Sequence, residues 1–430
     1  MKTQRNSPWL ALVVLASIGT VGFIDRIVVN VLVEPVKAEF GLTDFQVSLM
    51  AWAFAALNIG AGVVIARIAE RVRRLTLISV GTVLWSVATA LCGAAASWPQ
   101  LLVARMGVGL GEAIGLPSNQ SVIADYFPAG RRGLAMSVLL LSPPLGAFIG
   151  FVGGGWIAQE LDWRATFLVA AVPGLVLGVI AYFFVAEPKR GQHDPEADDA
   201  VPPISAVVSR LLALPSARNL VIGSALAAML GFGLNYFFTS LMMRKFELGI
   251  GEAGLYAGVI ASLPAALSVV GSGWLSDKLG TRSIAAYAMV PAVALLLGAP
   301  LYIFAITREN LVLLLSLVSV ATFLNFGYLG VTYAALQNLM HPRMRATASA
   351  LLSGLYGVAG ALGPSLLGLL SDWLAGDYGP ARGLAYAMAI SAAIYWWASA
   401  HYFVAARHLP RDSERIRLGA AGTAAAAPQT

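Results

Sequence analysis

Charged residues are scarce in this chain of 430 residues, since Asp, Glu, Lys and Arg together make up only 12% of it. A soluble domain usually carries about 25% of these residues. Apolar residues make up 58%, and the mean hydropathy is +0.76. The chain therefore has too few charges to cover a water-facing surface. This excludes a soluble enzyme, a nucleic-acid-binding module and a disordered regulator, and it indicates an integral membrane protein.

Residues that bind metals or form disulfides are scarce as well. The single cysteine, Cys92, excludes a disulfide framework and any cysteine-based metal cluster. The chain has four histidines, which are too scattered along it to suggest a metal site. We therefore expect neither a metal nor a cofactor.

The apolar residues fall into twelve runs, each of about the 20 residues that a membrane-crossing helix needs. The first six are predicted at 9–33, 44–66, 75–96, 99–122, 133–158 and 164–186. The last six are predicted at 219–243, 253–275, 283–305, 310–338, 346–371 and 383–406. The sequence thus predicts an all-α membrane protein with twelve transmembrane helices.

One long hydrophilic stretch divides these runs into two groups of six. It covers residues 187–218 and is rich in proline and acidic residues. We expect an N-terminal half at 1–186, a cytoplasmic linker at 187–218, a C-terminal half at 219–407 and a cytoplasmic tail at 408–430.

The distribution of positive charge predicts the orientation. Most of the 28 lysines and arginines fall on the side that holds both termini, which is the pattern of a cytoplasmic face. The opposite side receives only Lys37, Arg164, Arg244, Lys245, Arg308 and Arg382. We therefore expect a multi-pass protein, in a bacterial inner membrane, with both termini in the cytoplasm.

Two loops at corresponding places in the halves resemble each other. Between the eighth and ninth runs the chain reads Gly273-Trp-Leu-Ser-Asp277-Lys278-Leu-Gly280-Thr-Arg282. This closely resembles the G-x-x-x-D-[RK]-x-G-x-[RK] loop of the major facilitator superfamily. The resemblance implies two pseudo-symmetric six-helix halves in the major facilitator fold.

The loop between the second and third runs is a degenerate copy. Glu70 replaces the aspartate, Arg71 and Arg74 follow it, and both glycines are gone. A second pair of similar segments ends at Arg131 before the fifth run and at Arg345 before the eleventh. A carboxylate at a helix end can interact with the positive N-terminus of another helix. We expect these loops to form a cytoplasmic latch, which comprises Glu70, Arg71, Arg74, Asp277, Arg282, Arg131 and Arg345.

Residues 20–190 carry further motifs. The first run contains Gly22-Phe-Ile-Asp25-Arg26, followed by Glu34-Pro35 and Gly41-Leu-Thr-Asp44. The fourth contains Arg105-Met-Gly-Val-Gly-Leu-Gly-Glu112-Ala, followed by Asp125-Tyr-Phe-Pro. Together these segments resemble the Spinster family of facilitator transporters. The resemblance implies a transporter of lysophospholipid- or sphingolipid-type lipids that is often proton-coupled.

Four of these residues are charged side chains at membrane depth: Asp25, Arg26, Arg105 and Glu112. Each costs about 2.5–3.5 kcal/mol on insertion scales, so such residues usually serve a function. At about 1.5 Å per helical residue, Asp25 and Arg105 lie at a similar level, and Glu112 lies deeper. We expect Glu112, and then Asp25, to exchange protons, because Glu112 is placed farther from both arginines. A neutralising ion cluster that only joins the two helices is the alternative.

The C-terminal half offers neutral and aromatic side chains instead of deep charges. We expect Arg26 and Arg105 to bind an anionic headgroup and a second group of residues to line a cavity for the tail. That group is Asn235, Tyr236, Phe237, Asn325, Tyr328 and Tyr356.

The predicted function is secondary active transport of an amphipathic lipid-like substrate by alternating access. The alternative is a facilitator that exports drugs or carries small organic anions. An enzyme is not expected, because no G-x-S-x-G segment occurs and no apolar run holds a histidine near an acid. An ATP-driven pump is excluded because the chain has no G-x-x-x-x-G-K-[ST] loop. The expected partners are the substrate, protons and membrane lipids, with no nucleic acid, and the expected state is a monomer.

Overall fold

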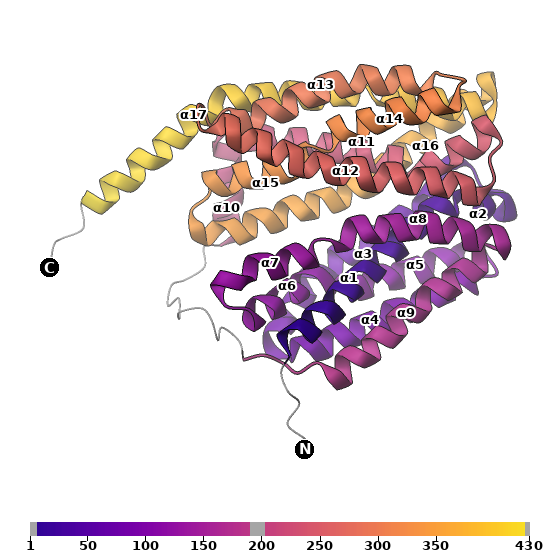
Figure 1. Cartoon of the computed structure of the whole chain (residues 1–430), viewed down its shortest axis with the longest axis horizontal. Coiled ribbons are helices and arrows are strands. Elements are labelled where there is room, and N and C mark those ends of the chain that lie inside the picture. The colour runs from indigo at the N-terminus through magenta and orange to yellow at the C-terminus, as the bar shows by residue number, and fades with distance from the viewer. Residues whose placement is uncertain (1–6, 190–202, 426–430) are drawn as a thin grey trace. The chain divides into compact units, whose positions relative to one another are not determined.

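The computed structural model describes residues 7–189 and 203–425, and within these ranges it contains helices and no strand. Figure 1 labels the helices in chain order. The first group is α1 (Pro8–Val31), α2 (Val33–Phe40), α3 (Asp44–Arg71), α4 (Arg74–Gly93), α5 (Trp98–Glu112), α6 (Gly115–Tyr126), α7 (Ala129–Leu139), α8 (Ser142–Glu160) and α9 (Trp163–Phe184). The second is α10 (Ile204–Ala213), α11 (Pro215–Phe246), α12 (Ile250–Gly280), α13 (Ala286–Ile306), α14 (Leu311–Asn325), α15 (Tyr328–Leu339), the 3₁₀ turn Pro342–Met344, α16 (Arg345–Ser391) and α17 (Ile394–Ala425).

Each of the twelve predicted apolar runs overlaps one or more of these helices, which confirms the all-α membrane fold. Ten segments of the described chain are long and apolar enough to cross a membrane. The fourth predicted run is not among them, because α5 ends at Glu112 and α6 begins at Gly115. The last two runs form one continuous helical stretch, Thr347–Ile416. That stretch bends at Gly379, whose φ of 77° is a left-handed conformation that glycine adopts at little cost.

Local sequence signals explain where several helices begin. The Ser7 side chain accepts a hydrogen bond from the N–H of Leu10, and Pro8 occupies the first position of α1. Asp162 caps α9 in the same way through the N–H of Ala165. These side chains satisfy N–H groups that have no partner within the helix.

The described chain forms two compact units. The first contains residues up to 198 together with Gly233–Ser262 and Pro364–Leu384, and the second contains Asp199–Phe232, Leu263–Gly363 and the remainder from Ala385. The two units differ from the predicted halves, because the first includes the end of α11, the start of α12 and an internal part of α16. The division into halves, linker and tail stays a prediction. Residues 190–202, within the predicted linker, lie outside the described residues.

In the first unit, α1 packs against α8 and α9, and α4 packs against α5 and α9 (Figure 1). Large apolar side chains fill the space between these helices, and Trp85, Phe151 and Phe167 are at most 2% exposed. In the second unit, α13 packs against α14, α15 and α17. Other apolar side chains face outward, such as Val103 at 66% and Val270 at 73% exposure, as expected where a protein contacts lipid.

Candidate functional site

Four charged side chains meet in the first unit, where α1 lies near α4 and α5. Asp25 and Arg26 come from α1, and Arg105 and Glu112 come from α5. Asp25, Arg105 and Glu112 are buried, at 1%, 3% and 5% exposure. We call these four residues the charge site. The structure thus brings together the residues that the sequence singled out.

The strongest contact of the charge site joins Arg26 to Glu112. The Arg26 Nε donates to the Glu112 Oε2 at 2.5 Å. The Arg26 side chain keeps 39% of its surface exposed, whereas that of Glu112 keeps 3%. The expectation that Glu112 lies away from both arginines is therefore wrong. The depth estimate fixes only the level of a residue along its helix, and the long Arg26 side chain reaches across to α5.

Asp25 and Arg105 interact less directly. The Arg105 Nη1 donates to the backbone carbonyl of Asp25 at 3.4 Å, and the Thr89 hydroxyl donates to the Asp25 Oδ2 at 3.2 Å. Within the described residues, three buried atoms of the charge site have no hydrogen-bond partner: Asp25 Oδ1, Arg105 Nε and Glu112 Oε1. Buried polar atoms of this kind are costly, so they point to a function beyond packing. The two carboxylate oxygens could accept a proton or a hydrogen bond, and the Arg105 Nε could donate one.

Aromatic rings complete the charge site, and sequence reasoning missed them. The Arg26 guanidinium lies over Phe23 at 5.2 Å and over Phe54 at 5.0 Å from the ring centroids. Phe54, on α3, also faces the Arg105 guanidinium at 5.4 Å. Attraction of this kind reaches to about 6 Å from the ring centroid. Phe54 is thus shared by both arginines.

The proposed tail residues of α11 are buried in the first unit. Asn235 accepts a hydrogen bond from Asn30 at 3.1 Å, and the Tyr236 hydroxyl donates to the carbonyl of Val47 at 2.9 Å. Tyr236 and Phe237 are 4% and 0% exposed. Their role in binding a tail stays a prediction.

The other proposed tail residues lie in the second unit. The ring centroids of Tyr328 and Tyr356 are 6.5 Å apart, and those of Tyr333 and Tyr356 are 6.1 Å apart. Asn325, at the end of α14, is 2% exposed and packs against Gly298 of α13. These side chains form an aromatic cluster with a few polar atoms.

Residues of the predicted latch contact neighbours within their own units. Arg74 is buried at the start of α4 and binds Asp125 at 2.5 Å and Glu187 at 2.9 Å. The Asp277 carboxylate accepts a hydrogen bond from the Tyr287 hydroxyl at 2.6 Å.

The remaining latch residues are more exposed or are not described in full. Arg345 donates from its Nε to the Gln337 carbonyl at 3.0 Å. Arg131 and Arg282 are exposed. The side chains of Glu70 and Arg71 lie outside the described residues. The latch stays a prediction.

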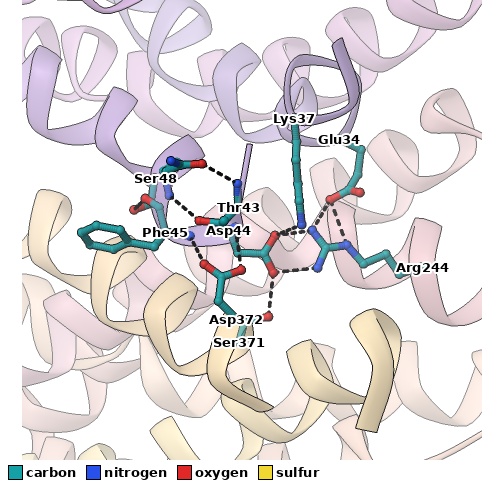
Figure 2. Close-up of polar contacts among 10 residues, drawn as sticks. Glu34, Lys37, Thr43, Asp44, Phe45, Ser48, Arg244, Ser371 and Asp372 are labelled. Atoms are coloured by element: carbon teal, nitrogen blue, oxygen red, sulfur yellow. Dashed lines mark hydrogen bonds and ion pairs between the residues drawn. The ribbon is translucent and has the colours of Figure 1, made fainter. Parts of the chain in front are cut away.

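A second ionic cluster, which was not predicted, lies where α3 begins and α11 ends (Figure 2). Arg244, at the end of α11, binds the carboxylates of both Glu34 and Asp44 with distances of 2.6–3.0 Å. Asp44 also accepts hydrogen bonds from Lys37 at 2.5 Å and from Ser371 at 2.7 Å. We call this the outer cluster, because the predicted topology places it at the extracytoplasmic side.

The outer cluster also holds the start of α3. The two carboxylate oxygens of Asp372, on α16, each accept a hydrogen bond at 2.8 Å, from the N–H of Asp44 and the N–H of Phe45. Thr43 and Gln46 form a local capping box, in which each side chain bonds the other's N–H at 3.1 and 2.9 Å. The first donors of α3 are therefore divided between its own residues and a carboxylate from another helix.

The sequence contained a weak signal for this cluster. Glu34 and Asp44 belong to the motifs that carry the Spinster resemblance, and Lys37 and Arg244 were placed together on one side of the membrane. Their pairing spans some 200 residues of chain, which a single sequence cannot show. Within the described residues, no group of three or more His, Cys, Asp or Glu side chains could hold a metal ion.

Comparison with known proteins gives consistent results. The family described as Major Facilitator Superfamily matches residues 15–364. A solved structure of a bacterial homologue of the human lysosomal transporter Spinster, inward-facing and unoccupied, superposes with a TM-score of 0.87 at 28% identity, covering 96% of this chain and 99% of that one. The predicted resemblance to the Spinster family is confirmed.

Sequence relatives have several substrates. An MFS-type efflux pump of Mycolicibacterium smegmatis is 30% identical, over 93% of this chain and 95% of its own length. The sphingosine-1-phosphate transporter SPNS2 of Danio rerio is 25% identical, over 87% and 78%. The D-galactonate transporter of Escherichia coli O6:H1 is 26% identical, over 89% and 93%.

Proposed function

This chain belongs to the Major Facilitator Superfamily and is a multi-pass membrane transporter, and on that premise we propose that it carries an amphipathic anion coupled to protons. The observation that carries the proposal is the ion pair between the partly exposed Arg26 and the buried Glu112. A buried ion pair contributes little net stability, because its desolvation offsets the attraction. Its retention at membrane depth favours a role in transport.

The ion pair provides a way to couple a proton to an anion. While Glu112 is ionised, it occupies the Arg26 Nε. When Glu112 takes up a proton its charge is lost, and the guanidinium becomes available to an anionic headgroup. Arg105 supplies a second positive charge nearby. Asp25, with its Oδ1 unpartnered among the described residues, is the second candidate proton carrier.

The proposed substrate combines this headgroup with an acyl tail. Relatives named for sphingolipid and sphingosine-1-phosphate transport support a lipid. The neutral aromatic residues of the C-terminal segments would receive the tail. Tyr236 and Phe237 are buried, so their contact with a tail requires a movement of α11.

Alternating access requires that each side of the protein close in turn. We propose that the outer cluster closes the extracytoplasmic side, because it ties α2 and α3 to the end of α11 and to Ser371 and Asp372 of α16. The predicted latch would act at the cytoplasmic side. The excess of Lys and Arg on the side of the termini supports this orientation. We further propose that the protein works as a monomer in a bacterial inner membrane.

A second candidate function is export of drugs or transport of small organic anions. The similarity to an efflux pump at 30% identity and to a D-galactonate transporter favours it. Such a substrate would use the arginines and would need no cavity for a tail.

Binding measurements on purified protein decide between these functions. The probes are lysophosphatidates with acyl chains of 8 to 18 carbons, D-galactonate and a cationic drug. For a lipid substrate, each methylene removed from the buried tail weakens binding by about 0.8 kcal/mol, or about fourfold. Affinity that does not change with chain length, or binding of D-galactonate alone, overturns the lipid proposal.

A further inference from the structure

We propose that Phe54 is a positioning residue of the charge site, whose ring holds both arginines ready for the anion. This inference rests on the proposed function, because it assigns the anion to Arg26 and Arg105. Three helices contribute: α1 carries Arg26, α5 carries Arg105, and α3 carries the ring between them. The two guanidinium carbons lie 5.0 and 5.4 Å from the centroid of this ring.

A ring suits this task better than a carboxylate. It attracts the flat face of a guanidinium and leaves the N–H groups at the edge free to bond. A carboxylate would accept those hydrogen bonds and neutralise the charge, so it would compete with an anionic ligand. The ring therefore offsets part of the cost of holding two positive charges near each other without occupying their donors. This is the requirement for a site that must bind an anion and release it.

The position of Phe54 is fixed by close contact between helices. A Cβ atom at Gly109, on α5, would lie 2.1 Å from the Phe54 carbonyl oxygen, so only glycine fits there. One turn further along α3, Asn58 donates a hydrogen bond to the Gly109 carbonyl at 3.1 Å. Gly109 stands between Arg105 and Glu112 in the sequence. The backbone that carries the Phe54 ring is thus held against the segment that carries both of these residues.

Phe23 provides a matched comparison within the site. Its ring lies 5.2 Å from the Arg26 guanidinium carbon, and it precedes Arg26 on the same helix. Its removal is expected to affect Arg26, whereas removal of the Phe54 ring affects Arg26 and Arg105 together.

The first test measures transport into proteoliposomes with oleoyl lysophosphatidate and with D-galactonate as probes. We expect Phe54→Leu to raise KM about tenfold and to leave the maximal rate within twofold of wild type. Phe54→Tyr keeps the ring and should restore KM to within twofold. Phe148→Leu, at a 42% exposed position on α8, is the control for loss of a ring elsewhere. Equal KM values for Phe54→Leu and wild type overturn the proposal, as does a KM for Phe54→Tyr as high as that of Phe54→Leu.

The second test needs no substrate. A ring shifts the NMR resonances of groups that lie over its face, so the Nε–Hε signals of labelled arginines report on the contacts directly. Substitution of each arginine by lysine assigns the signals. Phe54→Leu should move the signals of both Arg26 and Arg105, and Phe23→Leu should move that of Arg26 alone.

The two tests separate the possible failures. If wild type transports neither probe, the proposed function is wrong for these substrates, and the arginine signals still decide the role of Phe54. If Phe54→Leu leaves both signals in place, the positioning role is wrong, whatever the protein transports.

Discussion

Arg244 and Asp44 form a two-pronged ion pair across 200 residues of sequence, with Nη1 to Oδ2 at 2.8 Å and Nη2 to Oδ1 at 2.6 Å. Both side chains are largely buried, at 9% and 2% exposure. Removing one partner of such a pair leaves a charge without compensation and usually costs about 3–5 kcal/mol. Loss of either side chain alone should therefore weaken the contact between the start of α3 and the end of α11.

Arg244→Gln should open the extracytoplasmic side. Its loss leaves Glu34 and Asp44 as neighbouring carboxylates with only Lys37 to balance them. We expect a melting temperature several degrees lower and greater labelling, from outside, of a cysteine placed near Phe45. Lys245→Gln removes one positive charge at the neighbouring position and serves as the control. Equal labelling in the two variants would show that the outer cluster does not close this side.

Glu112→Gln should abolish proton-driven accumulation and leave substrate binding largely intact. The amide keeps the shape of the side chain and cannot exchange a proton, and it removes the charge that holds Arg26. The measurement is uptake against a gradient as a function of pH, beside binding to the same protein. Glu160→Gln, at an exposed position at the end of α8, is the control. Accumulation with the pH dependence of wild type would assign the proton to Asp25 or another group.

Asp277→Asn should favour opening at the cytoplasmic side, because it removes the negative charge from the loop that matches the latch motif more fully. The carboxylate also accepts a hydrogen bond from Tyr287, so Tyr287→Phe tests whether that bond alone matters. The same change at Glu70, Glu70→Gln, should do less, since its loop lacks both glycines of the motif. Cysteine accessibility from the cytoplasmic side measures the effect, and equal results at both loops contradict this asymmetry.

Glu39→Gln should reduce stability in a way that depends on pH. The hydrogen bond from Arg164 lowers the pKa of Glu39 below its ordinary value of 4.5, with a further contribution from Trp163. The ionised form is therefore favoured by folding. Its contribution is complete above about pH 4.5 and is lost as the pH falls through the lowered pKa. The difference in melting temperature between wild type and variant should be small, since Glu39 is exposed, and should shrink between pH 5 and pH 3. A constant difference would assign it to packing.

Residue types and spacing predicted most of the fold. Apolar runs of the right length predicted where the membrane-crossing helices lie, and the rarity of charge in them drew attention to Asp25, Arg26, Arg105 and Glu112. These signals are local, and the cost of burying charge makes them reliable.

Contacts between helices were not predictable in the same way. The sequence gives the level of Arg26 and Glu112 but not the rotation of their helices, so their ion pair was missed. Phe54 is one of 18 phenylalanines, and nothing in its neighbours distinguishes it. The outer cluster joins residues of α2, α3, α11 and α16, whose proximity is a property of the folded chain.

The divided capping of α3 has a consequence for any movement that separates the start of this helix from α16. Thr43 and Gln46 bond each other's N–H, so they keep the first turn intact without help from another helix. Loss of Asp372 exposes only the N–H groups of Asp44 and Phe45, which water can bond. We therefore expect α3 to keep its first turn when it separates from α16, so that this turn does not have to refold before the two helices meet again.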